Sequence, residues 1–268
     1  MIPELPEVET VRSHLAGWLP GRTIRSARLA DAQGPKYVNL ERAAGQRIHS
    51  VERRGKYLVL PLSGGDELIV HLGMTGRIRA TAPDGHLRVV VELDGPAPST
   101  LYFEDTRRFG RFLVAPDGDR SAVPTLAKMG PEPLEPEFTV ACLARGLQSR
   151  GSIKPLLHSQ RAVAGLGNIY IDEALWRARI HPLQPAHRVS RQKVGRLHEA
   201  IVEILSAAVE RGGTTLQDFR DVEGRSGGYG ADLQVYGRAG ESCTRCDAVL
   251  RRLLVAQRGT TFCPRCQA

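Results

Sequence analysis

The chain has 268 residues, of which 41% are hydrophobic and 25% charged, as in globular proteins with two or three compact units. No apolar run approaches the length of a membrane span, and the amino terminus lacks the basic start and apolar core of a secretory signal. These features argue against a membrane protein and a secreted protein, and we expect a cytoplasmic protein with no membrane partner.

The net charge of +8 is unevenly distributed. Residues 150–200 contain nine Lys and Arg against three Asp and Glu, a net charge of +6. Residues 243–268 contain five Arg against Asp247, a net charge of +4, so the rest of the chain carries −2. A basic carboxy-terminal half points to a polyanionic partner, most simply nucleic acid. The alternative is a basic surface that serves only solubility.

The first half of the chain predicts one helix followed by many strands. Val8, Val11, Leu15 and Leu19 share one helical face, and LPGR ends this helix. From about residue 22 to 115, turn signals separate short β-branched runs such as RTIRSARL, KYLVLPL, ELIVHLGM, LRVVVEL and TLYFED. Strands at short spacing without intervening helices predict an antiparallel sandwich or barrel.

The second half predicts helices and then a small separate module. GPEPLEPE (130–137) is typical of a linker, and a glycine-rich segment over 221–233 predicts a mobile loop. The expected helices span 138–149, 153–160, 168–179 and 190–211, the last with Val194, Leu197, Ile201, Ile204, Leu205 and Ala208 on one side. We therefore expect an α+β multidomain fold: an amino-terminal antiparallel β-sandwich with a leading helix (1–130), a helical domain (131–234) and a β-hairpin module (235–268).

Four cysteines predict a metal site in the last module. Cys243 and Cys246 form one CxxC pair, Cys263 and Cys266 form another, and sixteen residues separate the pairs. This spacing suits one structural Zn²⁺ with four thiolate ligands, and the metal would stabilise a module too small to fold unaided. Disulfides are the alternative, although a cytoplasmic protein disfavours them.

The residues between the pairs predict two strands joined at Arg258-Gly259. Arg258 at this turn would be well placed to contact a phosphate. An exposed, solvated arginine is the alternative.

The opening sequence MIPELPEVET is only partly explained by helix formation. Pro6 suits the first helical position and Glu7 suits the positive end of the helix dipole, but neither accounts for Pro3-Glu4. A proline at the start of a chain has a secondary amine, whose adduct with an aldehyde-like sugar carbon is a charged iminium and an electron sink. A neighbouring carboxylate can move protons.

PELPEVET resembles the amino terminus of the bacterial formamidopyrimidine-DNA glycosylases, bifunctional enzymes that remove oxidised purines. The resemblance continues in the same order along nearly the whole chain. Its further motifs are RRGKYL (53–58), HLGMTGR (71–77), DTRRFGRF (105–112), KPLL (154–157), GLGNIYIDE (165–173), LQVYGRAGESCTRC (233–246) and QRGTTFCPRC (257–266).

The resemblance implies three residues that act on the reacting sugar. Pro3 would be the nucleophile at C1′ and Glu4 the proton donor and acceptor. Lys56 would be a general acid or a cation that contacts a phosphate. Taken alone, RRGK (53–56) is more often a solvated turn.

The resemblance also implies six residues that contact DNA. The phosphates around the lesion would be bound by Lys154, Asn168 and Arg258. The gap left by the extruded nucleotide would be filled by Met74, Arg107 and Phe109, since chemistry on a base requires its removal from the stack. Without the resemblance, Met74 and Phe109 are typical of ordinary core residues.

For the chain as a whole, the resemblance implies a monomeric repair enzyme that acts on damaged double-stranded DNA without a small-molecule cofactor. GLGNIYIDE would belong to a helix–two-turn–helix element, and the 224–230 loop would cover the extruded base, although a disordered surface loop is also compatible. Strand cleavage would follow by β- and δ-elimination. The alternatives are an oxidised-pyrimidine glycosylase of the endonuclease VIII kind and a protein that binds damage without cleaving it.

One residue departs from the family pattern. Relatives begin Met-Pro-Glu, whereas Ile2 here precedes Pro3, and the nitrogen of an internal proline is an amide without nucleophilic power. Either translation starts at the Ile2 codon, or trimming exposes Pro3, or the chain binds damage without cleaving it. We hypothesise the first.

Overall fold

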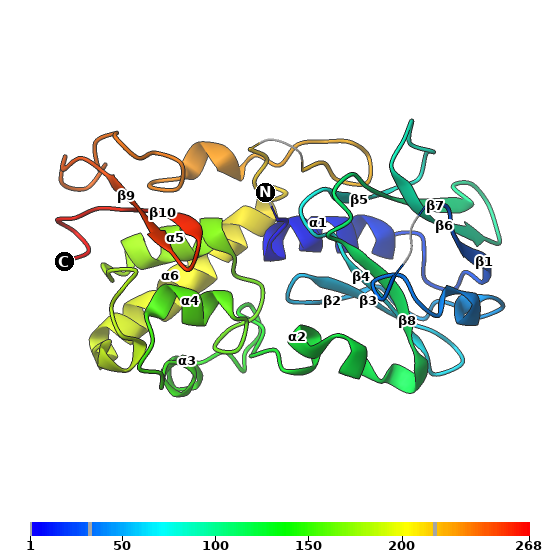
Figure 1. The fold of residues 1–268 in the computed structure, drawn as a ribbon, viewed down its shortest axis with the longest axis horizontal. Helices are drawn as coiled ribbons and strands as arrows, with labels where there is room; N and C mark the ends of the chain where they lie inside the picture. The colour runs from blue at the N-terminus through cyan, green and yellow to red at the C-terminus, as the bar shows by residue number, and fades with distance from the viewer. Residues whose placement is uncertain (1, 32–33, 217–218) are drawn as a thin grey trace. The chain divides into compact units, whose positions relative to one another are not determined.

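The computed structural model describes residues 2–31, 34–216 and 219–268, which form two compact units (Figure 1). The first unit contains Met1–Ala127 and Arg211–Gly228, and the second contains Lys128–Glu210 and Tyr229–Ala268. The chain therefore returns to the first unit for a short segment before it completes the second.

The first unit contains α1 (Leu5–Ala16) and two four-stranded antiparallel sheets, with strand orders β1-β6-β7-β5 and β2-β3-β4-β8. The strands are β1 Ile24–Leu29, β2 Glu52–Arg54, β3 Tyr57–Pro61, β4 Glu67–His71, β5 Gly76–Arg79, β6 Leu87–Leu93, β7 Thr100–Asp105 and β8 Arg111–Ala115. Short helical segments are η1 Leu40–Ala43, η2 Pro116–Gly118, η3 Arg120–Ala122 and α2 Pro124–Ala127. The five runs predicted as strands all contain one.

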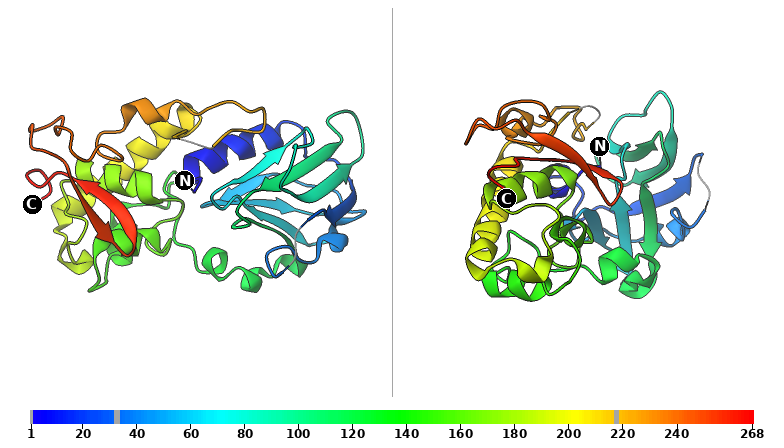
Figure 2. Two further views of the ribbon diagram at one scale, coloured as in Figure 1. Left: turned by 45° about the horizontal axis from the view of Figure 1, so that its top comes forward. Right: turned by 60° about the vertical axis from the view of Figure 1, so that its left-hand side comes forward.

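The two sheets and α1 enclose a common core, which makes this unit a β-sandwich with a leading helix (Figure 2). Leu60 of β3, Val91 of β6 and Phe103 of β7 are at most 3% exposed in this core. Val11 and Leu15 of α1 join them, and α1 packs against β2 and β3. Each such aliphatic side chain contributes about 1.5–3 kcal/mol on burial, so the predicted helical face anchors the amino terminus to the sandwich.

The second unit is helical and ends in a β-hairpin. Its elements are α3 Val140–Gly146, α4 Ile153–His158, α5 Asn168–Arg177, η4 Ala186–Arg188, α6 Arg191–Glu210, η5 Tyr229–Asp232, β9 Arg251–Val255 and β10 Arg258–Phe262. All four predicted helices are present, and the segment predicted as a mobile loop contains η5. The six α6 residues predicted to share a face are buried. Within the described ranges, no helix combines the length and apolar character needed to cross a bilayer.

The hairpin turn lies earlier than predicted. Arg258 pairs with Val255, so the turn consists of Ala256 and Gln257, which both have positive φ, at 47° and 62°. The prediction of a turn at Arg258-Gly259 was wrong because Gly259 serves a different purpose. A Cβ on Gly259 would lie 3.0 Å from the Arg252 guanidinium, so glycine permits a close approach across the hairpin.

Candidate active site and nucleic-acid interface

Glu4 and Glu7 form a buried carboxylate pair at the start of α1. The Glu4 N–H donates to Glu7 Oε2 at 2.8 Å, and the Glu4 side chain accepts from the Glu7 N–H, which completes a capping box. Glu7 Oε1 also accepts from the Thr214 N–H at 2.6 Å. Glu4 is 2% exposed, Glu7 is fully buried, and Pro3 is buried beside them. The Glu7 carboxylate therefore fixes the first turn of α1 against the returning segment 211–228.

Gly213 leaves the space that Glu7 occupies. Gly213 has φ +83°, and a Cβ there would lie 2.7 Å from Glu7 Oε1. We expect Gly213→Ala to lower the free energy of unfolding by about 1–3 kcal/mol through backbone strain and overpacking. Urea unfolding measures this loss.

Gly212→Ala is the matched control, because Gly212 also has positive φ (+70°) but its Cβ would meet nothing nearer than 4.0 Å. It should show the backbone strain alone. Equal losses in the two variants would argue against a close contact between Gly213 and Glu7.

The turn that carries Lys56 is also fixed to α1. Gly55 and Lys56 join β2 to β3, and Arg53 donates to both Glu9 Oε2 at 2.8 Å and the Gly55 carbonyl at 3.2 Å. Lys56 is only 8% exposed, so the alternative of a solvated turn is wrong. The Glu9–Arg53 ion pair thus connects the helix that begins beside Pro3 with the turn that presents Lys56.

His71 lies near this lysine and was not predicted as a functional residue. Its ring packs 4.7 Å from the ring of Tyr57, and its Nδ1 accepts from the Gly73 N–H at 3.1 Å. Burial, followed by the charges of Lys56 and Arg111, lowers the His71 pKa to about 3. His71 is therefore neutral in the neutral pH range, with its proton on Nε2. Only the HLGMTGR motif marked this position in the sequence.

Two loops bring Met74, Arg107 and Phe109 together on the first unit. Buried Asp105 accepts from Thr75 Oγ1 at 2.6 Å and from the Gly110 N–H at 2.7 Å, which fastens the β4–β5 loop to the β7–β8 loop. Arg107 Nη1 lies 3.8 Å from Met74 Sδ. Phe109 is 52% exposed, so its interpretation as a core residue was wrong. The three side chains thus lie on neighbouring loops, with Phe109 projecting to the surface.

In the second unit, Asn168 and β10 border a hollow of about 470 Å³. Asn168 is the first residue of α5, and its Nδ2 donates to the Gly259 carbonyl at 2.9 Å. Tyr236 and Thr261 also line this hollow, which we call the α5 cradle. Arg258, exposed at the start of β10, lies next to Gly259 along the chain. Backbone N–H groups at a helix start and a neighbouring guanidinium are groups that bind phosphate.

Lys154 lies inside the second unit. Its ammonium group is 2.6 Å from Asp172 Oδ1 and 2.7 Å from Thr260 Oγ1, and both charged side chains are at most 2% exposed. Burial raises the pKa of Asp172 to about 6, against the opposing effect of Lys154. The structure therefore places the Lys154 charge against Asp172 and β10 rather than at the surface of the cradle.

The four cysteines of the last module converge. Their sulfur atoms all lie within 4.8 Å of one another, with Cys246 and Cys263 at 3.5 Å and Cys243 and Cys266 at 4.0 Å. Zinc with Zn–S bonds of about 2.3 Å requires sulfurs about 3.8 Å apart, so the set fits tetrahedral zinc. All five cysteines are described and none forms a disulfide. The disulfide alternative was therefore wrong.

The protein around the sulfurs is consistent with bound thiolates. The Trp176 indole N–H donates to Cys243 Sγ at 3.4 Å, and Arg245 lies 4.0 Å over the Trp176 ring. Burial opposes ionisation of Cys243, but N–H donors including the Arg245 backbone outweigh it and lower the Cys243 pKa to about 6. Burial raises the pKa of Cys263 and Cys266, so a divalent cation is needed to hold all four as thiolates.

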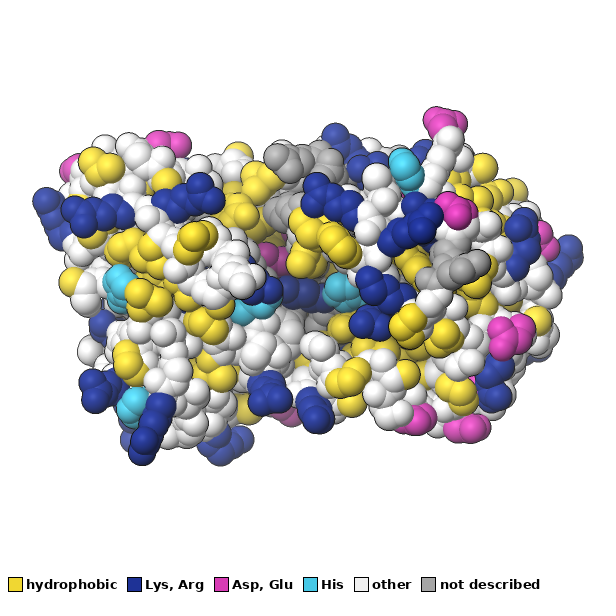
Figure 3. All heavy atoms as spheres, in the orientation of Figure 1, with side chains coloured by type: hydrophobic (Ala, Val, Ile, Leu, Met, Phe, Trp, Pro, Cys, Tyr) yellow, Lys and Arg dark blue, Asp and Glu magenta, His cyan; other side chains and the backbone are white. Residues whose placement is uncertain are grey.

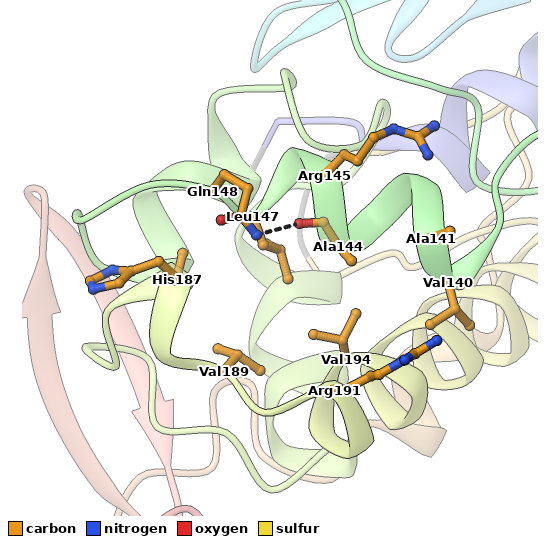
Figure 4. Close-up of a pocket in the computed structure, with 11 residues that line it drawn as sticks. Val140, Ala141, Ala144, Arg145, Leu147, Gln148, His187, Val189, Arg191 and Val194 are labelled. Atoms are coloured by element: carbon orange, nitrogen blue, oxygen red, sulfur yellow. Dashed lines mark hydrogen bonds between the residues drawn. The ribbon is translucent and has the colours of Figure 1, made fainter.

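Lys and Arg side chains are frequent on the surface. The second unit also has a groove apart from the α5 cradle. On the face drawn in Figure 3, Lys and Arg side chains predominate over Asp and Glu on both units. A groove of about 550 Å³ lies between α3 and α6. Figure 4 shows apolar side chains such as Val140 and Val194 pointing into it. Of the described residues that line this groove, none is a predicted site residue.

Comparisons with known proteins cover nearly the whole chain. The model of the formamidopyrimidine-DNA glycosylase N-terminal domain matches residues 2–112, that of its H2TH domain matches 129–220, and a zinc finger found in FPG and IleRS matches 240–268. A formamidopyrimidine-DNA glycosylase of Thermus thermophilus is 46% identical over 99% of this chain and 98% of its own length. The chain belongs to the formamidopyrimidine-DNA glycosylase family. A relative in Deinococcus radiodurans is 44% identical over 99% of this chain and 97% of its own.

Solved structures of this glycosylase family have the same fold as this chain. The crystal structure of the MutM (Fpg) protein from Thermus thermophilus superposes with TM-score 0.92, covering 99% of this chain and 98% of that one. Lactococcus lactis Fpg in complex with an abasic-site DNA is 36% identical, with TM-score 0.86 over 98% and 99% of the two chains. MutM in complex with carbocyclic 8-oxoG DNA is 37% identical, with TM-score 0.86 over 99% of both. The β-sandwich, the helix–two-turn–helix domain and the structural four-cysteine zinc finger of this family are all present in this chain.

Proposed function

We infer that this chain removes oxidised purines from damaged duplex DNA through the nitrogen of Pro3. The chain is a bifunctional DNA glycosylase and AP lyase of base excision repair, and its lesions are of the 8-oxoguanine and formamidopyrimidine kind. It acts as a monomer, and zinc serves a structural role.

The main support for this proposal is the turn at the start of α1, which contains Pro3 and Glu4. Pro3 and Glu4 are buried together, and Glu7 accepts from the Glu4 N–H through one oxygen and from the Thr214 N–H through the other. A nucleophile and a proton-transfer group on adjacent residues of a fixed turn have little freedom to lose when substrate binds. Lys56 supplies a cation on a turn that Arg53 and Glu9 hold against the same helix.

The chemistry follows from a free amine at Pro3. The nitrogen lone pair attacks C1′, the bond between C1′ and the base nitrogen breaks, and the base leaves with that electron pair and a proton. The Pro3 nitrogen loses its proton, and its lone pair then expels the ring oxygen O4′ from C1′. O4′ takes up a proton, so that the opened sugar is held on Pro3 as an iminium. This iminium acidifies the C2′ proton, whose removal expels the 3′ phosphate by β-elimination. A second elimination expels the 5′ phosphate. Glu4 donates and accepts the protons in these steps, and Lys56 assists as an acid or by contacting a phosphate.

The remaining site residues would bind the substrate. Asn168 and Arg258 would bind backbone phosphates, because the α5 cradle offers an amide side chain, a helix start and an exposed guanidinium. Met74, Arg107 and Phe109 would occupy the gap left by the extruded nucleotide. An exposed aromatic ring on the loop that also carries Arg107, whose guanidinium contacts the Met74 thioether, suits partial replacement of base stacking.

Reaction at Pro3 requires a chain that begins at Pro3, because an acylated nitrogen has no available lone pair. Two forms of the chain, one starting at Pro3 and one retaining Met1 and Ile2, test this requirement, with intact mass verifying each start. On a duplex with 8-oxoguanine opposite cytosine, borohydride should trap the Pro3-start form as a covalent DNA adduct. The longer form should bind the same DNA without being trapped.

Trapping of both forms with equal efficiency would exclude Pro3 as the nucleophile. Absence of trapping with the Pro3-start form at saturating DNA would leave a protein that binds damage without covalent chemistry.

A further inference from the structure

The α5 cradle is held by two acidic residues that follow one another on α5, Asp172 and Glu173. They are 1% and 3% exposed and do not line the cradle themselves. Successive helical residues diverge by about 100°, so the two carboxylates point to different neighbours. Each neighbour forms one wall of the cradle.

Asp172 holds the β10 wall. Asp172 Oδ2 accepts from the Thr261 N–H at 3.0 Å, while Asp172 Oδ1 pairs with Lys154, which donates to Thr260 Oγ1. Asn168 lies one helical turn before Asp172 on the same face, and it binds the Gly259 carbonyl on the same strand. Three successive residues of β10 are thus fastened to α4 and α5 by hydrogen bonds, of which those to Thr260 and Thr261 are buried.

Glu173 holds a second wall, formed by the segment that includes Tyr236. Its Oε2 accepts from the Gln234 N–H at 2.9 Å, and its Oε1 accepts from the N–H groups of Val235 and Tyr236 at 2.9 and 2.8 Å. Three backbone donors on one buried carboxylate fix the backbone over 234–236. Tyr236, at the end of this fixed segment, borders the cradle together with Gly237 and Ala239.

We propose that Asp172 and Glu173 are positioning residues that set the separation of the two walls, so that the cradle fits one DNA phosphate. This inference rests on the proposed phosphate contact of Asn168 and adds that the contact depends on both carboxylates. Lys154 contributes to DNA binding through β10.

Isosteric amides remove these links with little change in volume. In Glu173→Gln, one carboxylate oxygen becomes an NH₂ group that faces a backbone N–H, so at least one bond to 234–236 is lost. In Asp172→Asn, the amide must turn an NH₂ group toward either Lys154 or the Thr261 N–H. Glu203→Gln is the matched control, because Glu203 is an exposed residue of α6 paired with Arg177.

The experiment measures affinity for a duplex with an uncleavable tetrahydrofuran abasic site between 50 and 200 mM NaCl. A neutral amide contact such as that of Asn168 adds affinity without counterion release. Loss of one phosphate contact made by a guanidinium such as Arg258 lowers the slope of log K against log salt by about 0.9 and weakens binding about eightfold near 0.1 M salt. We expect both amide variants to show this change, with KM raised and kcat for 8-oxoguanine release retained. Glu203→Gln should match the unchanged chain.

The variant Asn168→Ala distinguishes the phosphate contact itself from the positioning role of Asp172 and Glu173. If it weakens binding while Asp172→Asn and Glu173→Gln do not, the positioning role is wrong and the phosphate contact stands. If Asn168→Ala leaves the affinity unchanged, the cradle does not bind phosphate and both ideas fail. A loss of kcat in proportion to folded protein, with an unchanged slope, would indicate purely structural roles and overturn the inference.

Should Asp172→Asn fail to fold, the double variant Lys154→Met/Asp172→Leu removes both buried charges and still detaches β10. It should show the same reduced slope, and a normal slope would contradict the proposal.

Discussion

Replacing Glu4 with glutamine is expected to lower the rate of base release and strand cleavage by about 10²–10⁴-fold, the usual contribution of general acid–base catalysis. A glutamine side chain cannot transfer protons, whereas its carbonyl can still accept the Glu7 N–H that completes the capping box. The fold and the DNA affinity should therefore be retained. Single-turnover rates on an 8-oxoguanine duplex with excess enzyme measure the chemistry separately from binding.

Glu92→Gln provides the control, because Glu92 is an exposed residue of β6 whose carboxylate accepts from Ser26 Oγ at 3.0 Å. It should leave both rate and affinity unchanged, with all variants prepared to start at Pro3. A Glu4→Gln enzyme with a normal single-turnover rate would remove Glu4 from proton transfer. Parallel losses of rate and affinity would instead indicate a damaged fold.

Local patterns in the sequence were sufficient to predict most elements of the fold. The period of α6 identified six buried residues, and all six are buried. The CxxC spacing predicted a four-sulfur cluster, and the sulfurs converge within 4.8 Å. These predictions succeeded because helical periodicity and metal-ligand spacing are encoded by residues close together in the chain.

Contacts between distant segments were beyond such patterns. The bond between Glu7 and Thr214 joins residues 207 positions apart, and that between Lys154 and Thr260 joins residues 106 positions apart. Without those partners, Glu7 was explained by the helix dipole alone, and Lys154 was expected, from the resemblance, to bind a phosphate. The positioning roles of the carboxylates on α5 have the same origin, since their partners follow much later in the chain.

Loss of the zinc should change the stability of the hairpin module by more than loss of Glu4 changes the activation free energy of the reaction. Structural zinc contributes about 10–16 kcal/mol in small modules, and the hairpin module has little core of its own. Replacing fully buried Cys263 with serine removes one thiolate ligand and is expected to abolish stoichiometric zinc binding. Metal analysis of the purified protein measures this directly.

The fluorescence of Trp176 should show whether the zinc module has lost its structure. Its indole N–H donates to Cys243 Sγ and its ring lies under Arg245, so loss of the zinc module exposes the ring and shifts its fluorescence to longer wavelength. The β-sandwich has a separate core, and its unfolding transition should persist.

The effect on DNA distinguishes a structural zinc from a catalytic one. Without a fixed module, Arg258 and the Gly259 carbonyl lose their positions, so affinity for an abasic-site duplex should fall and its salt dependence should weaken. The borohydride adduct at Pro3 should still form at high DNA concentration, since the nucleophile belongs to the other unit. Cys142→Ser, a change at the half-buried cysteine outside the cluster, should alter neither zinc binding nor DNA affinity.

A Cys263→Ser protein with one equivalent of zinc and unchanged affinity would show that the four-thiolate assignment is wrong. Loss of trapping at saturating DNA would instead give the metal a part in the chemistry.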